Sequence, residues 1–451
     1  MLVKISIENF KSFDNATELT MISSNKIRTN ASHRIKVKST QILKYGVVYG
    51  ANASGKTNLV EFFRFFKECV QTGIPMEAVQ MFCKNREENK ERESNFEIQM
   101  TVGDKFYAYG FSVILSRRKI TGEWLYELYQ NGTARCLFER EGSKRPVLDK
   151  SITLSNIEKN KFEIYADDFS GNESTLFLTE MNRGKKYEIR SKLLFFRNVY
   201  DWIQNHVAII TPNTPLIDLE YYYDDDSLLL INKLIETFDT GISKVKIEEI
   251  SVDELSNAMP KPVFDRVMRH VKSKIEEQEN PSFRMTMRSN ESFFNIEVDG
   301  HEEPKVTTIR LHHNKSFYDF GFEEESDGTR RLFDLMDMLL NKREDVLYVV
   351  DELERSLHPK LTEHFLQLFM QLHSEHRMQL LFTTHESSIM DQAIFRRDEI
   401  WFIERNAENA SKIYSLDRFK ERYDKVLSKA YLEGRYGAIP VFSSFEFREE
   451  K

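Results

Sequence analysis

The run from Gly50 to Thr57 carries the clearest chemical signal in this chain of 451 residues. Its members are Gly50, Ala51, Asn52, Ala53, Ser54, Gly55, Lys56 and Thr57. Glycines at this spacing let backbone N–H groups close around phosphates, the lysine reaches the β and γ oxygens, and the threonine hydroxyl can bind Mg²⁺. An apolar run at 46–49 precedes this phosphate loop, and a helix-like run begins at Asn58. The sequence therefore predicts a nucleoside triphosphate site formed by residues 50–58.

A second group of chemically useful residues ends the apolar run Val346–Val350, which is followed by Asp351 and Glu352. Such a run is typical of a buried parallel strand whose carboxyl end faces a ligand. We expect Asp351 to hold Mg²⁺ together with Thr57, and Glu352 to polarise the attacking water. The alternative is a buried strand that ends in solvated acids.

Ser326, Asp327 and Gly328 stand 25 residues before these carboxylates and begin a predicted helix with one apolar face. A Ser-x-Gly sequence at a helix N-terminus resembles the signature of ABC-type ATPases, in the degenerate form of the SMC, RecF and OLD groups. The resemblance implies that hydroxyl, N–H groups and the positive helix end meet the γ-phosphate of a nucleotide bound by the opposite protomer. An ordinary Ser-capped amphipathic helix is the alternative.

His385 follows the next predicted strand, Gln379–Thr384. A histidine at this place resembles the switch residue of ABC ATPases, which contacts the γ-phosphate and the attacking water. The segment 354–359 between the two strands resembles the loop that crosses the dimer interface, and its His358 is the less favoured catalytic histidine because it does not stand at a strand end. A single histidine is more often structural than catalytic, so the assignment to His385 depends on the order of the motifs.

The whole chain resembles the ATPases of bacterial abortive-infection and antiphage systems, including the ATPase of PARIS-type defence. Four segments carry this resemblance: Val3–Phe13, Gly50–Asn58, Glu325–Arg331 and Tyr431–Pro440. It implies ATP and Mg²⁺ as ligands, a homodimer or larger homo-oligomer, and a separately encoded effector such as a TOPRIM-type nuclease. Only 66 residues follow His385, and a fused nuclease would need a domain of about 100 residues, so we expect no nuclease within this chain.

Two details of the family pattern stay open in the sequence. Gln99 and Gln130 are both candidates for the Q-loop glutamine of ABC heads. Lys11 to Phe13 flank the adenine if the resemblance holds at the opening segment, and otherwise they form an edge strand and a turn. Val3, Ile5 and Ile7 alternate with polar residues, which predicts a half-buried strand.

The elements that must position these motifs form an α/β fold: a P-loop ABC-ATPase head with a mixed sheet and an antiparallel β-subdomain, split by a mainly helical insertion. Lys56 and Asp351 are 295 residues apart, more than the 100–150 residues of a typical domain. We expect residues 1–192 and 306–451 to build the head. Short strand-like runs at 95–101, 106–115, 124–130 and 152–154 predict the β-subdomain.

Residues 193–305 are the expected insertion, used for dimer or partner contacts. Leu228–Phe238 and Pro262–Ile275 have helical spacing, and no heptad pattern lasts long enough for a coiled coil. Strand-like alternation resumes at 283–299 and 306–313. Arg266, Arg269, Lys272 and Lys274 form either a basic stripe that contacts DNA phosphates or a solvated helix face.

Composition limits the function. A net charge of −8 and a pI near 5.9 argue against coating nucleic acid through bulk charge, although local DNA contacts remain allowed. Cys69, Cys83 and Cys136 have no metal-binding spacing. No long apolar stretch or signal sequence is visible, so we expect a cytoplasmic protein without membrane contact.

These observations predict an ATPase in which two protomers sandwich ATP and signal to an effector as a sensor or scaffold subunit. A RecF- or SMC-like ATPase acting directly on DNA in repair or chromosome maintenance is the alternative. A scaffold that binds ATP and scarcely hydrolyses it is a third hypothesis.

Overall fold

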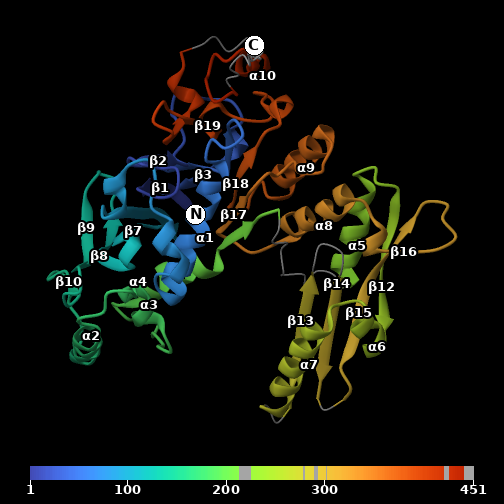
Figure 1. The fold of residues 1–451 in the computed structure, drawn as a ribbon, viewed down its shortest axis with the longest axis horizontal. Helices are drawn as coiled ribbons and strands as arrows, with labels where there is room; N and C mark the ends of the chain where they lie inside the picture. The colour runs from blue at the N-terminus through green and yellow to red at the C-terminus, as the bar shows by residue number, and fades with distance from the viewer. Residues whose placement is uncertain (213–224, 278–279, 289–292, 301, 421–425, 441–451) are drawn as a thin grey trace, which may run out of the picture. The chain divides into compact units, whose positions relative to one another are not determined.

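The computed structural model describes residues 1–212, 225–277, 280–288, 293–300, 302–420 and 426–440. The chain divides into two compact units (Figure 1). The first comprises Met1–Ile209, Arg343–Leu353 and the described residues from His373 onward. The second comprises the described residues of Ile210–Lys342 together with Glu354–Leu372.

A six-stranded sheet carries the predicted nucleotide motifs. Its order is β11 (Val207–Ile210), β17 (Val346–Val350), β18 (Met378–Thr384), β5 (Tyr45–Tyr49), β19 (Ile400–Arg405) and β20 (Ser411–Ser415). The strands from β17 to β19 are parallel, and β20 is antiparallel to β19. Every residue of β5, β17 and β18 is buried, which confirms the prediction of buried parallel strands. Their carboxyl ends share one edge, where the phosphate loop, Asp351 and His385 follow.

A second, antiparallel sheet of seven strands confirms the predicted β-subdomain. Its order is β10 (Val147–Leu148), β9 (Ala134–Glu141), β8 (Lys119–Leu128), β7 (Lys105–Ile114), β6 (Ser94–Val102), β1 (Leu2–Glu8) and β2 (Thr17–Thr20). Buried and partly exposed residues alternate in β1 as expected. Residues 152–154 lie in a loop, not in a strand, and β9 supplies the next strand instead. The short strands β3 (Arg34–Val37) and β4 (Thr40–Leu43) form a separate pair.

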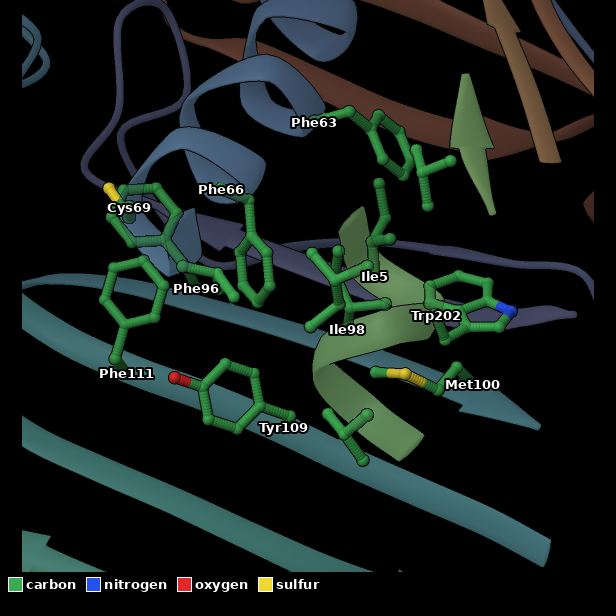
Figure 2. Packing of buried hydrophobic residues seen from close by; sticks show 14 of the residues in the cluster. Ile5, Phe63, Phe66, Cys69, Phe96, Ile98, Met100, Tyr109, Phe111 and Trp202 are labelled. Carbon is green, nitrogen blue, oxygen red and sulfur yellow. The ribbon is translucent and has the colours of Figure 1, made fainter. Parts of the chain in front are cut away.

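An aromatic core fixes α1 (Lys56–Thr72), the helix that follows the phosphate loop. Figure 2 shows Phe63, Phe66 and Cys69 of α1 facing aromatic and aliphatic side chains of β6 and β7 and Trp202 of α4 (Leu194–Asn205). The rings of Phe66 and Phe111 are 5.2 Å apart. Each aromatic side chain buries about 150–250 Å², so this core holds α1 firmly against the seven-stranded sheet. The remaining helices of this unit are α2 (Asn156–Asp168), α3 (Phe177–Asn182) and α10 (Leu427–Leu432).

The second unit contains both helices and a sheet. The sheet order is β12 (Ile242–Ile250), β15 (Lys305–His313), β14 (Phe293–Asp299) and β13 (Ser282–Arg288), and β16 (Phe320–Gly321) pairs with β15. Its helices are α5 (Asp225–Glu236), α6 (Val252–Asn257), α7 (Lys261–Glu276), α8 (Asp327–Leu340) and α9 (Pro359–Leu372). Helices α5 and α7 coincide with the two predicted helices. The structure adds β12 as a strand that the expectation of a mainly helical insertion did not include.

The border between the units also differs from the expected insertion at 193–305. Helix α4 belongs to the first unit because Phe196, Val199 and Trp202 are buried in the core around α1. Helices α8 and α9 belong to the second unit, although we expected 306–451 to complete the head. Helix α8 contacts α5 and α9, so the helix of the signature motif packs with the inserted segment.

Two further sequence features have structural counterparts. Among the described residues, no helix combines the length and apolar character needed to cross a membrane.

All three cysteines are unpaired, and burial raises the pKa of the Cys69 thiol. That burial keeps the Cys69 sulfur protonated as part of the core.

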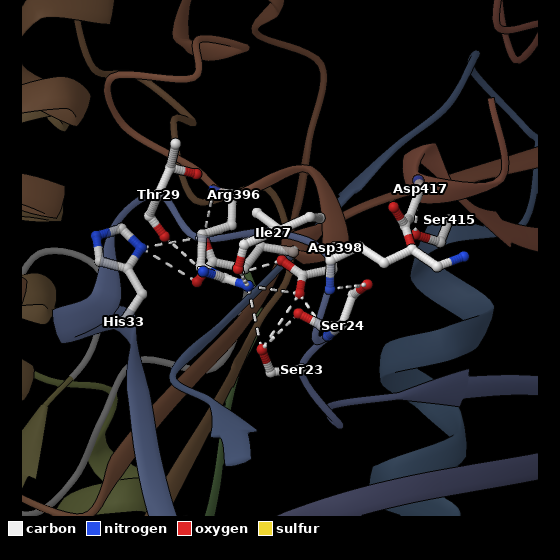
Figure 3. A network of polar contacts seen from close by, with 11 residues as sticks. Ser23, Ser24, Ile27, Thr29, His33, Arg396, Asp398, Ser415 and Asp417 are labelled. Atoms are coloured by element: carbon white, nitrogen blue, oxygen red, sulfur yellow. Dashed lines mark hydrogen bonds and ion pairs between the residues drawn. The ribbon is translucent and has the colours of Figure 1, made fainter. Parts of the chain in front are cut away.

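A buried polar network joins the segment 23–33 to the turn before β19 (Figure 3). Arg396 is fully buried, and its guanidinium donates to Asp398 Oδ1 at 2.9 Å, to Asp398 Oδ2 at 2.8 Å and to Ser23 Oγ at 3.1 Å. Asp398 also accepts from the Ser24 backbone N–H at 2.7 Å. Nearby, His33 lies 3.1 Å from Glu399, and burial raises the pKa of that carboxyl. Because these groups satisfy one another, the charges can remain buried.

We predict that Arg396→Met destabilises the first unit by about 3–5 kcal/mol, because it leaves the Asp398 carboxylate buried without its cation. Urea denaturation gives the free energy of unfolding. The double variant Arg396→Met with Asp398→Asn should recover part of the loss. A single variant as stable as the wild type would show that the network contributes nothing to stability.

Candidate functional site

The phosphate loop is shaped by the hairpin of β19 and β20. A Cβ atom on Gly50 would lie 2.4 Å from the Ile403 carbonyl oxygen, and one on Gly55 would lie 2.4 Å from Ser411 Oγ. Gly55 also has a φ of +113°, a conformation that side chains rarely adopt. Both glycines of the motif are therefore required by the close approach of the hairpin.

Three polar side chains hold the loop from outside. The Asn58 amide donates to Ser12 Oγ at 2.7 Å. Ser411 Oγ lies 2.7 Å from Ser12 Oγ and 2.5 Å from the Ser54 carbonyl oxygen. Segments from the opening of the chain and from β20 thus fix the loop. Neither Ser12 nor Ser411 was singled out from the sequence as a loop-holding residue, because a single serine gives no signal of such a distant contact.

The opening segment forms a turn beside this site. Phe13 is fully buried in the core, so its ring has no free face for an adenine base. Lys11 makes an ion pair with Glu61 at 3.1 Å. Of the two interpretations left open for Lys11 to Phe13, the burial of Phe13 favours the turn.

Lys56 lies over its own loop. Its ammonium donates to the carbonyl oxygens of Gly50 at 2.7 Å and Ala51 at 3.0 Å, and it stands 3.4 Å from His385 Nδ1. Only 5% of Lys56 is exposed. The carbonyl oxygens of the loop thus hold the cation beside the loop that would bind a phosphate.

Thr383, one residue before the end of β18, connects the Asp351 carboxylate to the backbone of Glu352. Its hydroxyl donates to Asp351 Oδ1 at 2.7 Å and accepts from the Glu352 backbone N–H at 2.9 Å. Asp351 is 3% exposed, whereas Glu352 turns outward with a φ of +49°. Adjacent carboxylates thus occupy different environments, which suits one for holding a metal ion and the other for contact with water. A threonine inside a buried strand is ordinary, so the sequence alone does not single out Thr383.

A cavity of about 470 Å³ gathers the motifs of the first unit. It is lined by Asn52, Ala53, Gly55, Lys56, Thr57, Asn58, Glu352, His385 and Arg405. The side chains of Glu352 and His385 are 38% and 37% exposed, and Glu352 Oε1 lies 3.9 Å from His385 Nε2. Part of the phosphate loop, Glu352 and His385, which are far apart in the chain, therefore meet around one space.

Other candidates lie elsewhere. Asp351, the first residue after β17, is buried and does not line the cavity. Gln99 donates to Glu97 at 2.9 Å, and Gln130 accepts from Ser39 at 2.6 Å. Neither glutamine lines the cavity. Arg405 does line the cavity. Its one signal in the sequence is a cation at the end of an apolar run, which is too weak to predict a site residue.

The signature residues belong to the second unit. Ser326 caps α8 by accepting from the Thr329 N–H at 3.1 Å, and Asp327 pairs with Arg330 at 2.6 Å. A Cβ on Gly328 would lie 2.6 Å from the Ser356 carbonyl oxygen, so only glycine lets the segment after β17 pack here. His358 Nδ1 accepts from the Lys360 N–H at 3.2 Å and so caps α9. That contact gives His358 a structural role.

The donors present fit Mg²⁺ bound together with a nucleotide. Within the described ranges, no group of three His, Cys, Asp or Glu side chains could hold a metal ion by itself. Mg²⁺ at phosphates needs only one or two protein oxygens, because phosphate and water oxygens complete its shell. Thr57 lines the cavity, and the carboxylate of Asp351, the residue before Glu352, accepts a hydrogen bond from the Thr383 hydroxyl. The predicted pair is chemically suitable.

We predict that Thr383→Val lowers the free energy of unfolding by about 1–3 kcal/mol, because the buried Asp351 carboxylate loses its hydroxyl donor. Thr383→Ser keeps the hydroxyl and should cost less. Urea denaturation of both variants measures the difference. Equal stabilities of the valine and serine variants would contradict a structural role for the hydroxyl.

Several solved structures of SMC heads are similar to this chain. A SmcHead bound to the C-winged helix domain of ScpA has 12% identity and a TM-score of 0.39, with 92% of this chain and 97% of that chain covered. The SMC head domain from Thermotoga maritima has 12% identity and a TM-score of 0.35, with 92% of this chain and 98% of that chain covered. An Smc head domain with an extended coiled coil bound to the C-terminal domain of ScpA, derived from Pyrococcus furiosus, has 13% identity and a TM-score of 0.40. That match covers 96% of this chain and 98% of that chain. Among curated proteins, none matches the chain.

A family model gives a match over most of the chain. Its description is "AAA domain, putative AbiEii toxin, Type IV TA system", and it matches residues 47–391. This range includes the phosphate loop, the signature residues, both carboxylates and His385. The chain therefore belongs to this AAA-domain family of ATPases.

Proposed function

We propose that this protein binds and hydrolyses ATP with Mg²⁺ in the cavity of the first unit. The observation that carries the proposal is the cavity itself, where the phosphate loop, Lys56, Glu352 and His385 meet. A site built only for binding would not need a carboxylate and a histidine 3.9 Å apart beside the lysine.

Each residue has a separate role in the proposed reaction. The N–H groups of the phosphate loop and the Lys56 ammonium bind the triphosphate and stabilise its charge. Thr57 and Asp351 would hold Mg²⁺, which supplies further charge neutralisation at the β and γ oxygens when bound. Glu352 and His385 orient the attacking water. The Thr383 hydroxyl keeps Asp351 and Glu352 in place.

Ser326, Asp327 and Gly328 complete the site in our proposal from a second copy of the chain. These residues begin a helix whose positive end suits a γ-phosphate. The second unit also has a cavity of about 240 Å³ next to this helix end, lined by Asp327, Arg330, Arg331 and Ser356 among others. Its lining holds three arginines and two aspartates, and Asp327 and Asp334 pair with Arg330 and Arg331. One positive charge in excess is left for an anionic ligand. ATP would then be sandwiched between two protomers.

The biological role that we propose is that of a sensor or scaffold subunit in a bacterial abortive-infection system in the cytoplasm. The family description names a putative AbiEii toxin and a type IV TA system. The proposal combines that description with the resemblance of the chain to abortive-infection ATPases. ATP binding and hydrolysis would change the assembly and signal to a separate effector protein, such as a nuclease.

The alternative is an ATPase that acts directly on DNA. Helix α7 exposes Arg266, Arg269 and Lys272, whereas Lys274 is partly buried with its ammonium 5.2 Å from the ring centre of Phe283. Three exposed cations could contact phosphates, but the overall charge of −8 does not favour nucleic acid. ATP turnover that rises strongly with duplex DNA, with no other protein present, would favour this alternative.

We predict that Lys56→Ala and Glu352→Gln separate binding from chemistry. Lys56→Ala loses a charged contact to the phosphates and should weaken ATP binding about 10- to 100-fold. Glu352→Gln keeps the shape of the site and should slow hydrolysis about 10²- to 10⁴-fold with binding retained. Fluorescent-nucleotide titration and phosphate release measure the two properties. Tight ATP binding by Lys56→Ala would refute the assignment of the site.

We predict that Glu352→Gln becomes a dimer when Mg-ATP is added, because each site needs the signature residues of a second copy. Light scattering with and without Mg-ATP gives the mass in solution. A larger assembly of constant mass would mean that ATP changes the shape of a permanent complex. A monomer in both conditions would refute the shared site.

A further inference from the structure

Arg405 is the last residue of β19 and points to the same face as two core residues of that strand. Side chains alternate along a strand, so Trp401, Ile403 and Arg405 share one face. Trp401 and Ile403 are 6% and 0% exposed and pack in the core that also contains Leu59 of α1. Arg405 continues this face beyond the core, which explains why it lines the nucleotide cavity.

The backbone beneath Arg405 is fixed relative to the phosphate loop. Just before it, Glu404 accepts from the Tyr414 hydroxyl at 2.8 Å and from the Ala438 N–H at 3.1 Å. Across the ladder, Arg405 pairs with Ser411, whose hydroxyl lies 2.5 Å from the Ser54 carbonyl oxygen. The arginine therefore extends from a rigid position beside the loop.

The guanidinium is available for a ligand. Across the parts of the chain that the structure describes, no carboxylate pairs with Arg405, and the residue is exposed. The cavity lining holds two permanent cations, Lys56 and Arg405, and one carboxylate, Glu352. This excess of positive charge suits a polyphosphate. A planar guanidinium can donate two parallel hydrogen bonds to phosphate oxygens.

We propose that Arg405 contacts the phosphates of the nucleotide bound by its own protomer. This inference depends on the proposed function, because it assigns a further nucleotide-contacting residue to the same site. Arg405 places its positive charge at the end of β19, whereas Lys56 places its positive charge at the start of α1. The triphosphate is thereby held from two sides by cations on different elements.

The test compares Arg405→Ala, Arg405→Lys and Arg405→Gln with Lys412→Ala. Lys412 is an exposed cation of the same hairpin that lies opposite Glu404, on the other face from Arg405. Titration with Mg-ATP carrying a fluorescent label gives the affinity. Arg405→Ala and Arg405→Gln should bind about tenfold more weakly or worse, since a charged hydrogen bond is lost. Arg405→Lys should recover part of the affinity, and Lys412→Ala should bind like the wild type.

A second measurement separates a phosphate contact from a structural effect. ATP binding by the wild type should weaken more steeply with added salt than binding by Arg405→Ala, and thermal unfolding should be the same for both because Arg405 is exposed. If the wild type binds ATP and Arg405→Ala binds it equally well, the inference is wrong and the proposed function stands. If the wild type binds no nucleotide, the proposed function fails, and the inference fails with it.

Discussion

The close approach of the β19–β20 hairpin to the phosphate loop is the contact on which the site depends. Glycine at positions 50 and 55 removes the side chains that would collide with Ile403 and Ser411. The hairpin can then hold the loop through Ser411 and bring Arg405 to the cavity. Without this approach, the loop would lose its contact with Ser411, and the cavity would lose Arg405.

The same edge of the parallel sheet separates two tasks for neighbouring carboxylates. Thr383 lies on β18, between the strands of Asp351 and the phosphate loop, and its hydroxyl binds both Asp351 and the backbone of Glu352. One carboxylate remains buried and the other faces the cavity. A single hydroxyl therefore fixes both residues, to which our proposal assigns metal binding and orientation of the water.

The two-unit organisation suits a protein that transmits a change of state. The nucleotide cavity lies wholly in the first unit, and the signature helix lies in the second. The segment after Glu352 passes from one unit to the other and packs on Gly328 through Ser356. The chain is therefore continuous from the cavity residue Glu352 to a segment that packs in the second unit. In our proposal, this is how ATP turnover would reach an effector.

Local spacing within the sequence was sufficient to predict the phosphate loop, the strands β5, β17 and β18, helices α5 and α7, and the meeting of Glu352 with His385. These features have short-range signals, such as glycine spacing and apolar periodicity. The roles of Ser12, Thr383, Arg405 and Ser411, the strand β12 and the place of α4 were decided by tertiary structure alone. Each depends on a contact between segments that are distant in the chain. The type of a residue does not indicate which distant segment it will contact. A serine, a threonine or an exposed arginine becomes part of a site only when folding brings a loop, a strand end and a hairpin to the same place.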